Sequence, residues 1–165
     1  ARSRMDTFDQ FREDIEKDLS EVVDLIKKDP RVNIKNIFAT GFSNGGFWVC
    51  YLTGNAKVSA GVSHYGVWKA NFGREITNSY PMDYFSKSSA PILALHGNSD
   101  DTQKLEFAEE AWEDIVSRGA TLETHVYAGA DHGWDKKNSW KFPYNPIVDK
   151  DSHKRTVDFF KKYMK

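Results

Sequence analysis

The chain has 165 residues, and its 23 basic residues nearly balance its 24 acidic ones. This length suits one domain over residues 1–165, and the absence of a long like-charge block or of a bilayer-length apolar run predicts neither a nucleic-acid nor a membrane partner. A single cysteine excludes an internal disulfide and leaves the compartment undetermined, with the cytoplasm as default and a secreted or periplasmic location open after signal-peptide removal.

The hydrophobic pattern predicts alternating helices and strands. Apolar residues recur every three or four positions over residues 7–28, which predicts an amphipathic helix. Short apolar runs predict four strands, at residues 34–40, 58–65, 91–95 and 122–127. Further helices are predicted at residues 44–53, 103–118 and 151–164. This alternation predicts an α/β fold, with about four parallel strands flanked by helices.

The same periodicity assigns the inward faces of the first and last helices. In the first helix the predicted inward residues are Phe8, Phe11, Ile15, Leu19, Val22 and Ile26. In the last helix they are Val157, Phe160 and Met164. The segments 67–89 and 129–150 show no clear period, and we expect them to be largely irregular.

The most informative segment is Gly41–Gly46, which places G-x-S-x-G between a predicted strand and a predicted helix. We predict Ser43 as a nucleophile, with Gly41 and Gly45 leaving room where strand and helix nearly touch. The backbone N–H of Asn44 would be an oxyanion donor at the helix start. The alternative is that Ser43 only caps a helix in a glycine-rich turn.

A serine hydroxyl needs a base to accept its proton and a third group to orient that base. His96–Asp100 follows the third predicted strand, and Ala130–Gly133 follows the fourth. Because parallel strands bring their carboxyl ends to one rim, we predict that His132 is the base for Ser43 and that Asp100 orients His132. Asp101 is the alternative acid, although it is better placed to cap the next helix.

The remaining histidines and the cysteine are expected to play structural parts. His64 either lines the pocket or is a hydrogen-bonded strand-end residue, and His96, His125 and His153 are predicted to be structural or bystanders. We predict that Cys50 is a small core residue of the helix at 44–53. No H-x-x-x-H or C-x-x-C spacing occurs, so the sequence predicts no metal and no cofactor.

Taken together, the motifs resemble those of the dienelactone hydrolase family of α/β-hydrolases. Its members share a G-x-[CS]-x-G-G elbow, an H-G-x-x-D segment and an [AG]-x-H-[GAS]-[FW] segment. Here these are Gly41–Gly46, His96–Asp100 and Ala130–Trp134, within a resemblance that runs from about Phe8 to Lys165.

The resemblance implies a serine hydrolase that cleaves small carboxylic esters or lactones. It assigns the nucleophile to Ser43, the acid to Asp100 and the base to His132. The namesake enzymes use cysteine at the elbow, and the serine here points toward ordinary carboxylesters. Prolyl-oligopeptidase-type peptidases share very similar motifs, so cleavage of peptides or acyl-peptides stays open as an alternative.

The chain departs from the family pattern because several strands expected before the helix at 7–28 are missing. The resemblance therefore implies a truncated α/β-hydrolase fold without the loop that normally supplies the second oxyanion donor. The strand near 34–40 would become an open apolar edge, and we expect a homodimer through it. The chain is then either a minimal hydrolase completed by self-association or a catalytically silent fragment.

Aromatic residues predict the walls of the substrate pocket. Phe42, Trp68 and Trp134 are expected to contact a small acyl or aryl ester. The alternative is that these aromatic side chains form a second small core.

Overall fold

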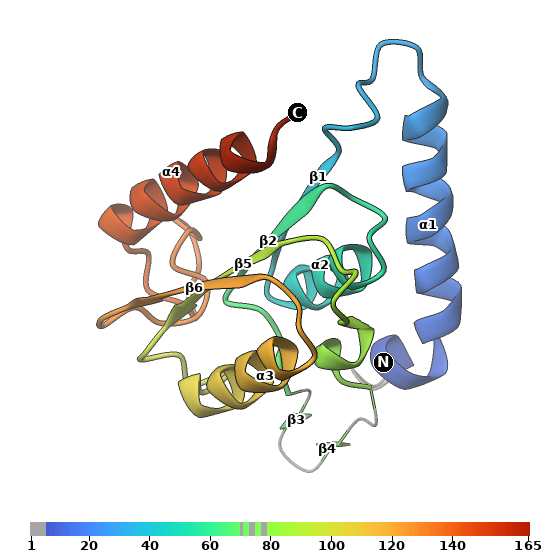
Figure 1. Ribbon diagram of the computed structural model, residues 1–165. Coiled ribbons are helices and arrows are strands. Elements are labelled where there is room, and N and C mark those ends of the chain that lie inside the picture. The colour runs from blue at the N-terminus through green and yellow to red at the C-terminus, as the bar shows by residue number, and fades with distance from the viewer. Residues whose placement is uncertain (1–5, 70, 73–74, 77–78) are drawn as a thin grey trace.

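A computed structural model describes residues 6–69, 71–72, 75–76 and 79–165. Its main sheet has four parallel strands in the order β1-β2-β5-β6, as Figure 1 shows. These strands are β1 (Phe38–Phe42), β2 (Ala60–His64), β5 (Ile92–Gly97) and β6 (Leu122–Tyr127). The predicted parallel sheet of four strands is therefore confirmed.

Helices cover both faces of this sheet (Figure 1). They are α1 (Arg12–Lys28), α2 (Asn44–Gly54), α3 (Leu105–Ser117) and α4 (Pro146–Tyr163). Helix α4 lies on one face, α2 and α3 lie on the other, and α1 stands beside α2 at the β1 end. The segment predicted to be irregular contains the short antiparallel pair β3 (Asn71–Phe72) and β4 (Glu75–Ile76), followed by a 3-10 turn at Pro81–Tyr84.

The central strand β5 shows why the strands of this sheet have continuous apolar sequences. Ile92 and Ala94 join a buried cluster with residues of α2 and α3, whereas Leu93 and Leu95 join another with residues of α4. All four side chains are buried. A parallel strand covered on both faces has no solvated side, so the alternation of a half-exposed strand is absent.

The first predicted helix is divided in two. Asp6–Gln10 forms a separate π-helical turn, from which Phe8 packs edge-on against Phe47 at 4.8 Å between ring centroids. Val22 and Ile26 were predicted to face inward, but they are 51% and 40% exposed. Their prediction was wrong because α1 packs on α2 through Val23, the next position around the helix.

The inward face of α4 also differs from the prediction. Val157 and Met164 are 48% and 56% exposed. Ser152 and Thr156 take inner positions instead, because both hydroxyls find buried hydrogen-bonding partners. The Ser152 hydroxyl accepts from the indole of Trp134 at 3.3 Å. A hydrophobicity pattern cannot find such positions, since it counts Ser and Thr as outward residues.

Strand β1 is an edge of the sheet, with β2 as its one strand neighbour among the described residues. The N–H of Ser43 donates to β2, and the carbonyl of Ile37 accepts from the residue before β2. Because the backbone groups of a parallel strand alternate in direction, those of Phe38, Thr40 and Phe42 face away from β2. Nearby exposed apolar side chains on α1 and the loop after it are Val22, Leu25, Ile26 and Ile34.

The homodimer expected from the sequence stays a prediction, and the free edge of β1 supplies its test. We expect Thr40→Pro and Leu25→Glu each to shift the chain from a dimer to a monomer, because one removes an outward N–H and the other charges the neighbouring apolar surface. Light scattering after size exclusion measures the mass. Ile147→Glu, at an exposed position on α4, is the control. A wild-type chain that is monomeric at tens of micromolar would contradict the prediction.

His64, at the end of β2, makes the stability depend on pH. It is buried, its Nε2 lies 3.1 Å from the Thr156 hydroxyl, and its Nδ1 has no hydrogen-bonding partner among the described residues. Burial lowers the pKa of His64 to about 4. Below pH 6.5 the His64 side chain of the unfolded chain gains a proton, whereas in the folded chain it does so only near pH 4. The free energy of unfolding therefore decreases as the pH is lowered from about 6.5 to 4.

We expect His64 to remove about 2 kcal/mol of unfolding free energy between pH 7.5 and pH 5. Urea unfolding at the two pH values measures this loss. The loss should shrink by that amount in His64→Gln and stay at the wild-type value in the exposed-site control Ile147→Gln. An equal loss in wild type and His64→Gln would show that the proton uptake occurs elsewhere.

Candidate active site

The turn from β1 into α2 brings strand and helix unusually close together. A Cβ on Gly41 would lie 2.2 Å from the carbonyl oxygen of Gly45, and one on Gly46 would lie 2.4 Å from the Ser63 hydroxyl. Between them Ser43 adopts a positive φ of 55°, with ψ at −118°. Such a conformation is strained for a residue with a side chain, and here it presents the serine at the point of the turn.

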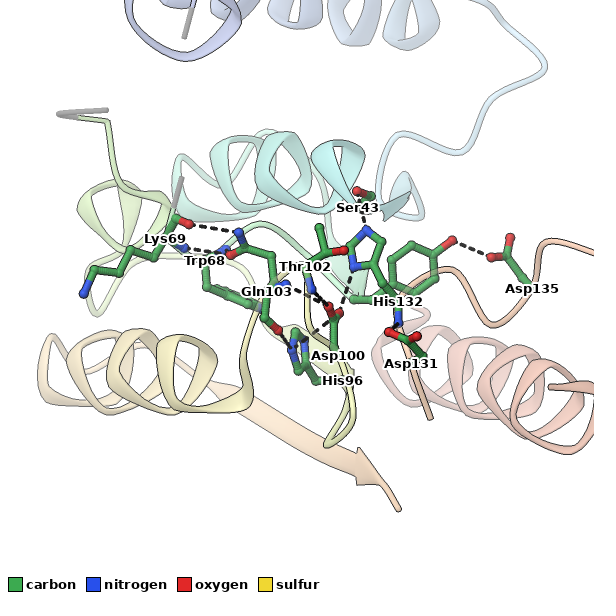
Figure 2. Close-up of polar contacts among 11 residues, drawn as sticks. Ser43, Trp68, Lys69, His96, Asp100, Thr102, Gln103, Asp131, His132 and Asp135 are labelled. Atoms are coloured by element: carbon green, nitrogen blue, oxygen red, sulfur yellow. Dashed lines mark hydrogen bonds and ion pairs between the residues drawn. The ribbon is translucent and has the colours of Figure 1, made fainter. Parts of the chain in front are cut away.

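The Ser43 hydroxyl lies 2.8 Å from Nε2 of His132, a separation that fits a hydrogen bond (Figure 2). His132 is buried in the loop between β6 and α4. Its Nδ1 lies 2.8 Å from Oδ2 of Asp100. Because a carboxylate can only accept, Nδ1 carries the proton in that contact, and Nε2 is left with a lone pair that faces the serine.

Asp100 is fixed by the turn that follows β5. Its Oδ1 accepts the backbone N–H groups of Thr102 at 2.8 Å and Gln103 at 2.7 Å, which leaves Oδ2 for His132. The carboxylate is buried, whereas Asp101 next to it is exposed. The structure thus brings Ser43, Asp100 and His132 together and leaves the alternative acid outside the cluster.

Of the other predicted structural residues, His96 lies next to this hydrogen-bonded chain, with its Nε2 3.8 Å from Oδ2 of Asp100, and the rest lie apart from it. His96 is buried, its Nε2 donates to the carbonyl of Gln103 at 2.8 Å, and burial lowers its pKa. Cys50 is buried in α2, and burial raises the pKa of its thiol. His125 lies on β6 and His153 on α4, facing Asp149 at 3.8 Å.

Two aromatic rings lie against the imidazole of His132. The ring of Tyr65 lies edge-on to His132 at 4.7 Å between centroids, and Phe142 lies at 5.1 Å. Gln103 accepts from the N–H groups of Trp68 and Lys69, at 3.0 and 3.1 Å, which joins the acid turn to the segment after β2. A buried Gln two residues after an Asp pair carries no motif, so no sequence signal could have found it.

The residues predicted to contact substrate have different surroundings. Phe42 is half-buried beside the elbow and stacks on His64 at 4.4 Å. Trp68 and Trp134 are 1% and 0% exposed, so neither offers a surface that a ligand could touch. Both indoles belong to buried clusters, Trp68 on the α3 face of the sheet and Trp134 on the α4 face. This placement agrees with the alternative that they form core.

Asn44 begins α2, so its backbone N–H belongs to the first turn, where amide groups have no partner within the helix. Its side chain is exposed, and the N–H of Gly46 donates to the Ser43 carbonyl at 2.9 Å. The positive end of the helix dipole therefore lies beside the serine hydroxyl, where it favours negative charge.

Within the described ranges, no group of three or more His, Cys, Asp or Glu side chains is arranged to hold a metal ion. Across the same residues, no helix is both long and apolar enough to cross a membrane.

Residues 1–164 match the sequence profile of the dienelactone hydrolase family. Over 140 residues, 70% of this chain, the sequence is 25% identical to the uncharacterized peptidase YuxL of Bacillus subtilis, of which that stretch is 21%. The chain thus spans about a fifth of that relative.

Solved structures share the fold. A putative dienelactone hydrolase from Klebsiella pneumoniae superimposes with a TM-score of 0.76 at 24% identity, covering 90% of this chain and 61% of that one. A carboxylesterase from Lactobacillus plantarum superimposes with a TM-score of 0.77 at 15% identity, covering 89% of this chain and 66% of that one. The chain therefore spans somewhat less than two thirds of these structures.

The elbow geometry predicts opposite effects for two neighbouring glycines. Gly41→Ala should lower the free energy of unfolding by about 3 kcal/mol, because its methyl group would meet the backbone of Gly45. Gly45→Ala should be neutral or raise it by up to about 1 kcal/mol, because a Cβ there meets nothing within 4 Å and Ala favours a helix. Urea denaturation measures both. Equal effects of the two changes would contradict this account of the turn.

Proposed function

This chain belongs to the dienelactone hydrolase family, and we propose that it is a serine hydrolase that cleaves small carboxylic esters. Ser43 is the nucleophile, His132 the base and Asp100 the acid that orients it. One observation carries the proposal: a continuous hydrogen-bonded chain runs from the Ser43 hydroxyl through both nitrogens of His132 to the buried carboxylate of Asp100.

In the proposed reaction the Ser43 oxygen attacks the ester carbonyl carbon while Nε2 of His132 takes the hydroxyl proton. The tetrahedral intermediate collapses, and the same nitrogen gives that proton to the departing alkoxide, which leaves as an alcohol. Water then loses a proton to His132 and attacks the acyl group on Ser43. The carboxylic acid leaves, and the serine recovers its proton from the histidine.

Two charges develop during these steps, and the chain has a group for each. The imidazolium that forms when His132 accepts a proton faces the Asp100 carboxylate at 2.8 Å. The oxyanion of the tetrahedral intermediate would accept from the N–H of Asn44 at the start of α2. Losing a single oxyanion donor typically lowers the rate by ~10²–10³-fold, so one donor is a substantial contribution.

A small ester substrate fits the half-buried aromatic surfaces beside these groups. Phe42 lies on one side of the elbow, and the ring centroid of Phe142 lies 5.1 Å from that of His132. An acyl or aryl group would lose apolar surface against these rings. Lactones, which are internal esters, are open to the same attack on their carbonyl carbon.

Peptide cleavage is the second candidate, and one observation favours it. The Bacillus relative that matches 70% of this chain is named as a peptidase. The same nucleophile and base could attack an amide, where the proton from His132 would be given to a departing amine. Rates on an aminoacyl anilide that exceed those on an aryl ester of the same acid would support this candidate.

We expect Ser43→Ala to reduce hydrolysis of a short-chain aryl ester by at least ~10³-fold, because the nucleophile is lost. A fluorophosphonate probe should label the wild-type chain at Ser43, as located by peptide mass mapping. Ser117→Ala, at the exposed end of α3, is the matched control and should keep both activity and labelling. A wild-type chain with no turnover and no labelled serine would favour the catalytically silent fragment.

A further inference from the structure

His132 lies in a long loop, residues 128–145, between β6 and α4, so its position depends on contacts that hold this loop against the rest of the fold. Both imidazole nitrogens of His132 point to other parts of the fold, toward Ser43 and Asp100. Each hydrogen bond is sensitive to where the loop backbone lies. Three residues after the base, the Asp135 carboxylate accepts a hydrogen bond from the phenol of Tyr65 at 2.5 Å (Figure 2).

Tyr65 is held firmly at the end of β2. Its backbone N–H donates to the carbonyl of Leu95 at 2.7 Å, and its side chain is 0% exposed. Its φ of 36° is unusual for a bulky residue and directs the ring across the rim of the sheet. The ring lies edge-on to both His132 and Trp134, at 4.7 Å between centroids in each case.

The loop is therefore tied to the sheet through one buried side chain, which contacts it at His132 and at Asp135. The hydroxyl of Tyr65 binds Asp135, while its ring contacts the imidazole itself. Burial, together with the hydrogen bond to Asp135, raises the pKa of Tyr65, so the phenol stays a donor at neutral pH. A neutral donor on a carboxylate is a strong, short hydrogen bond that fixes direction as well as distance.

We propose that Tyr65 is a positioning residue whose hydrogen bond to Asp135 sets the place of His132 relative to Ser43. The Tyr65 hydroxyl acts through the loop, while its ring lies against the imidazole. The inference rests on the proposed function, because it assigns a role within that reaction. A displacement of about 1 Å in a reacting group can lower a rate by as much as ~10²-fold, so loss of the tie should be visible in catalysis.

The experiment compares hydroxyl deletions at two tyrosines. Tyr65→Phe keeps the ring beside His132 and removes the bond to Asp135. Tyr127→Phe is the matched control, because the Tyr127 phenol donates to Asp151 on α4 at 3.0 Å and so ties down the helix rather than the base loop. Each variant is measured for aryl ester kcat and KM, for the second-order rate of fluorophosphonate labelling at Ser43, and for urea stability.

We expect Tyr65→Phe to lower kcat and the labelling rate about tenfold with KM nearly unchanged. Tyr127→Phe should lose comparable stability and keep wild-type kcat and labelling. Asp135→Asn keeps a carbonyl oxygen that can accept from the phenol and should retain most activity, whereas Asp135→Ala should match Tyr65→Phe. Because Tyr65→Phe and Asp135→Ala remove the same hydrogen bond, the double variant Tyr65→Phe/Asp135→Ala should be no slower than either single variant.

The outcomes separate this inference from the proposed function. If wild type shows turnover and labelling while Tyr65→Phe matches it per folded molecule, the positioning role is overturned and Tyr65 is merely structural. If wild type shows neither, the proposed function itself fails. If Tyr65→Phe does not fold, the test uses variants of the half-exposed Asp135 instead. A kcat of Asp135→Ala equal to that of Asp135→Asn would then overturn the inference.

Discussion

The contact between the end of β1 and the first turn of α2 is the constraint on which the site depends. With no side chain at Gly41, β1 approaches the backbone of α2 to a distance that a methyl group would prevent, and Gly46 allows a similar approach between α2 and Ser63 of β2. The chain then has to reverse within one residue, and Ser43 takes the positive φ that this turn demands. The strained conformation persists because the buried helix α2 that follows it is held by extensive packing.

Sheet topology then converts sequence distance into proximity. Parallel strands in the order β1-β2-β5-β6 bring the residues after each strand to one rim. Ser43, Asp100 and His132 come from the ends of three different strands, yet adjacent members are 2.8 Å apart. The end of β2 supplies Tyr65, so every strand of the sheet contributes a residue that contacts His132 or its hydrogen-bonding partners.

The same topology leaves the site at one side of the sheet. β1, which ends just before Ser43, is an edge strand among the described residues, with outward-facing backbone groups. In structures that share the fold, about a third of the chain has no counterpart here. The edge strand and the elbow are continuous, so a chain that paired with β1 would lie close to Ser43.

The sequence by itself determined the alternation of elements, the parallel sheet and the position of the elbow. Strict local rules govern these features, such as apolar runs for doubly covered strands and glycines where strand and helix meet. It also favoured Asp100 over Asp101 from position in the turn, and the structure buries the former and exposes the latter. Local patterns sufficed here because each of these choices depends on near neighbours in the chain.

Only the tertiary structure decided which faces of α1 and α4 are buried and which aromatic residues are core. Val23 replaces Val22 as the buried residue of α1, and Thr156 of α4 is buried where His64 of β2 lies 3.1 Å away. Trp134 is fully buried because Tyr65 and Tyr127 pack against it from two strands. Burial of this kind is set by partners distant in sequence, and a hydrophobicity pattern holds no record of which distant residues will meet.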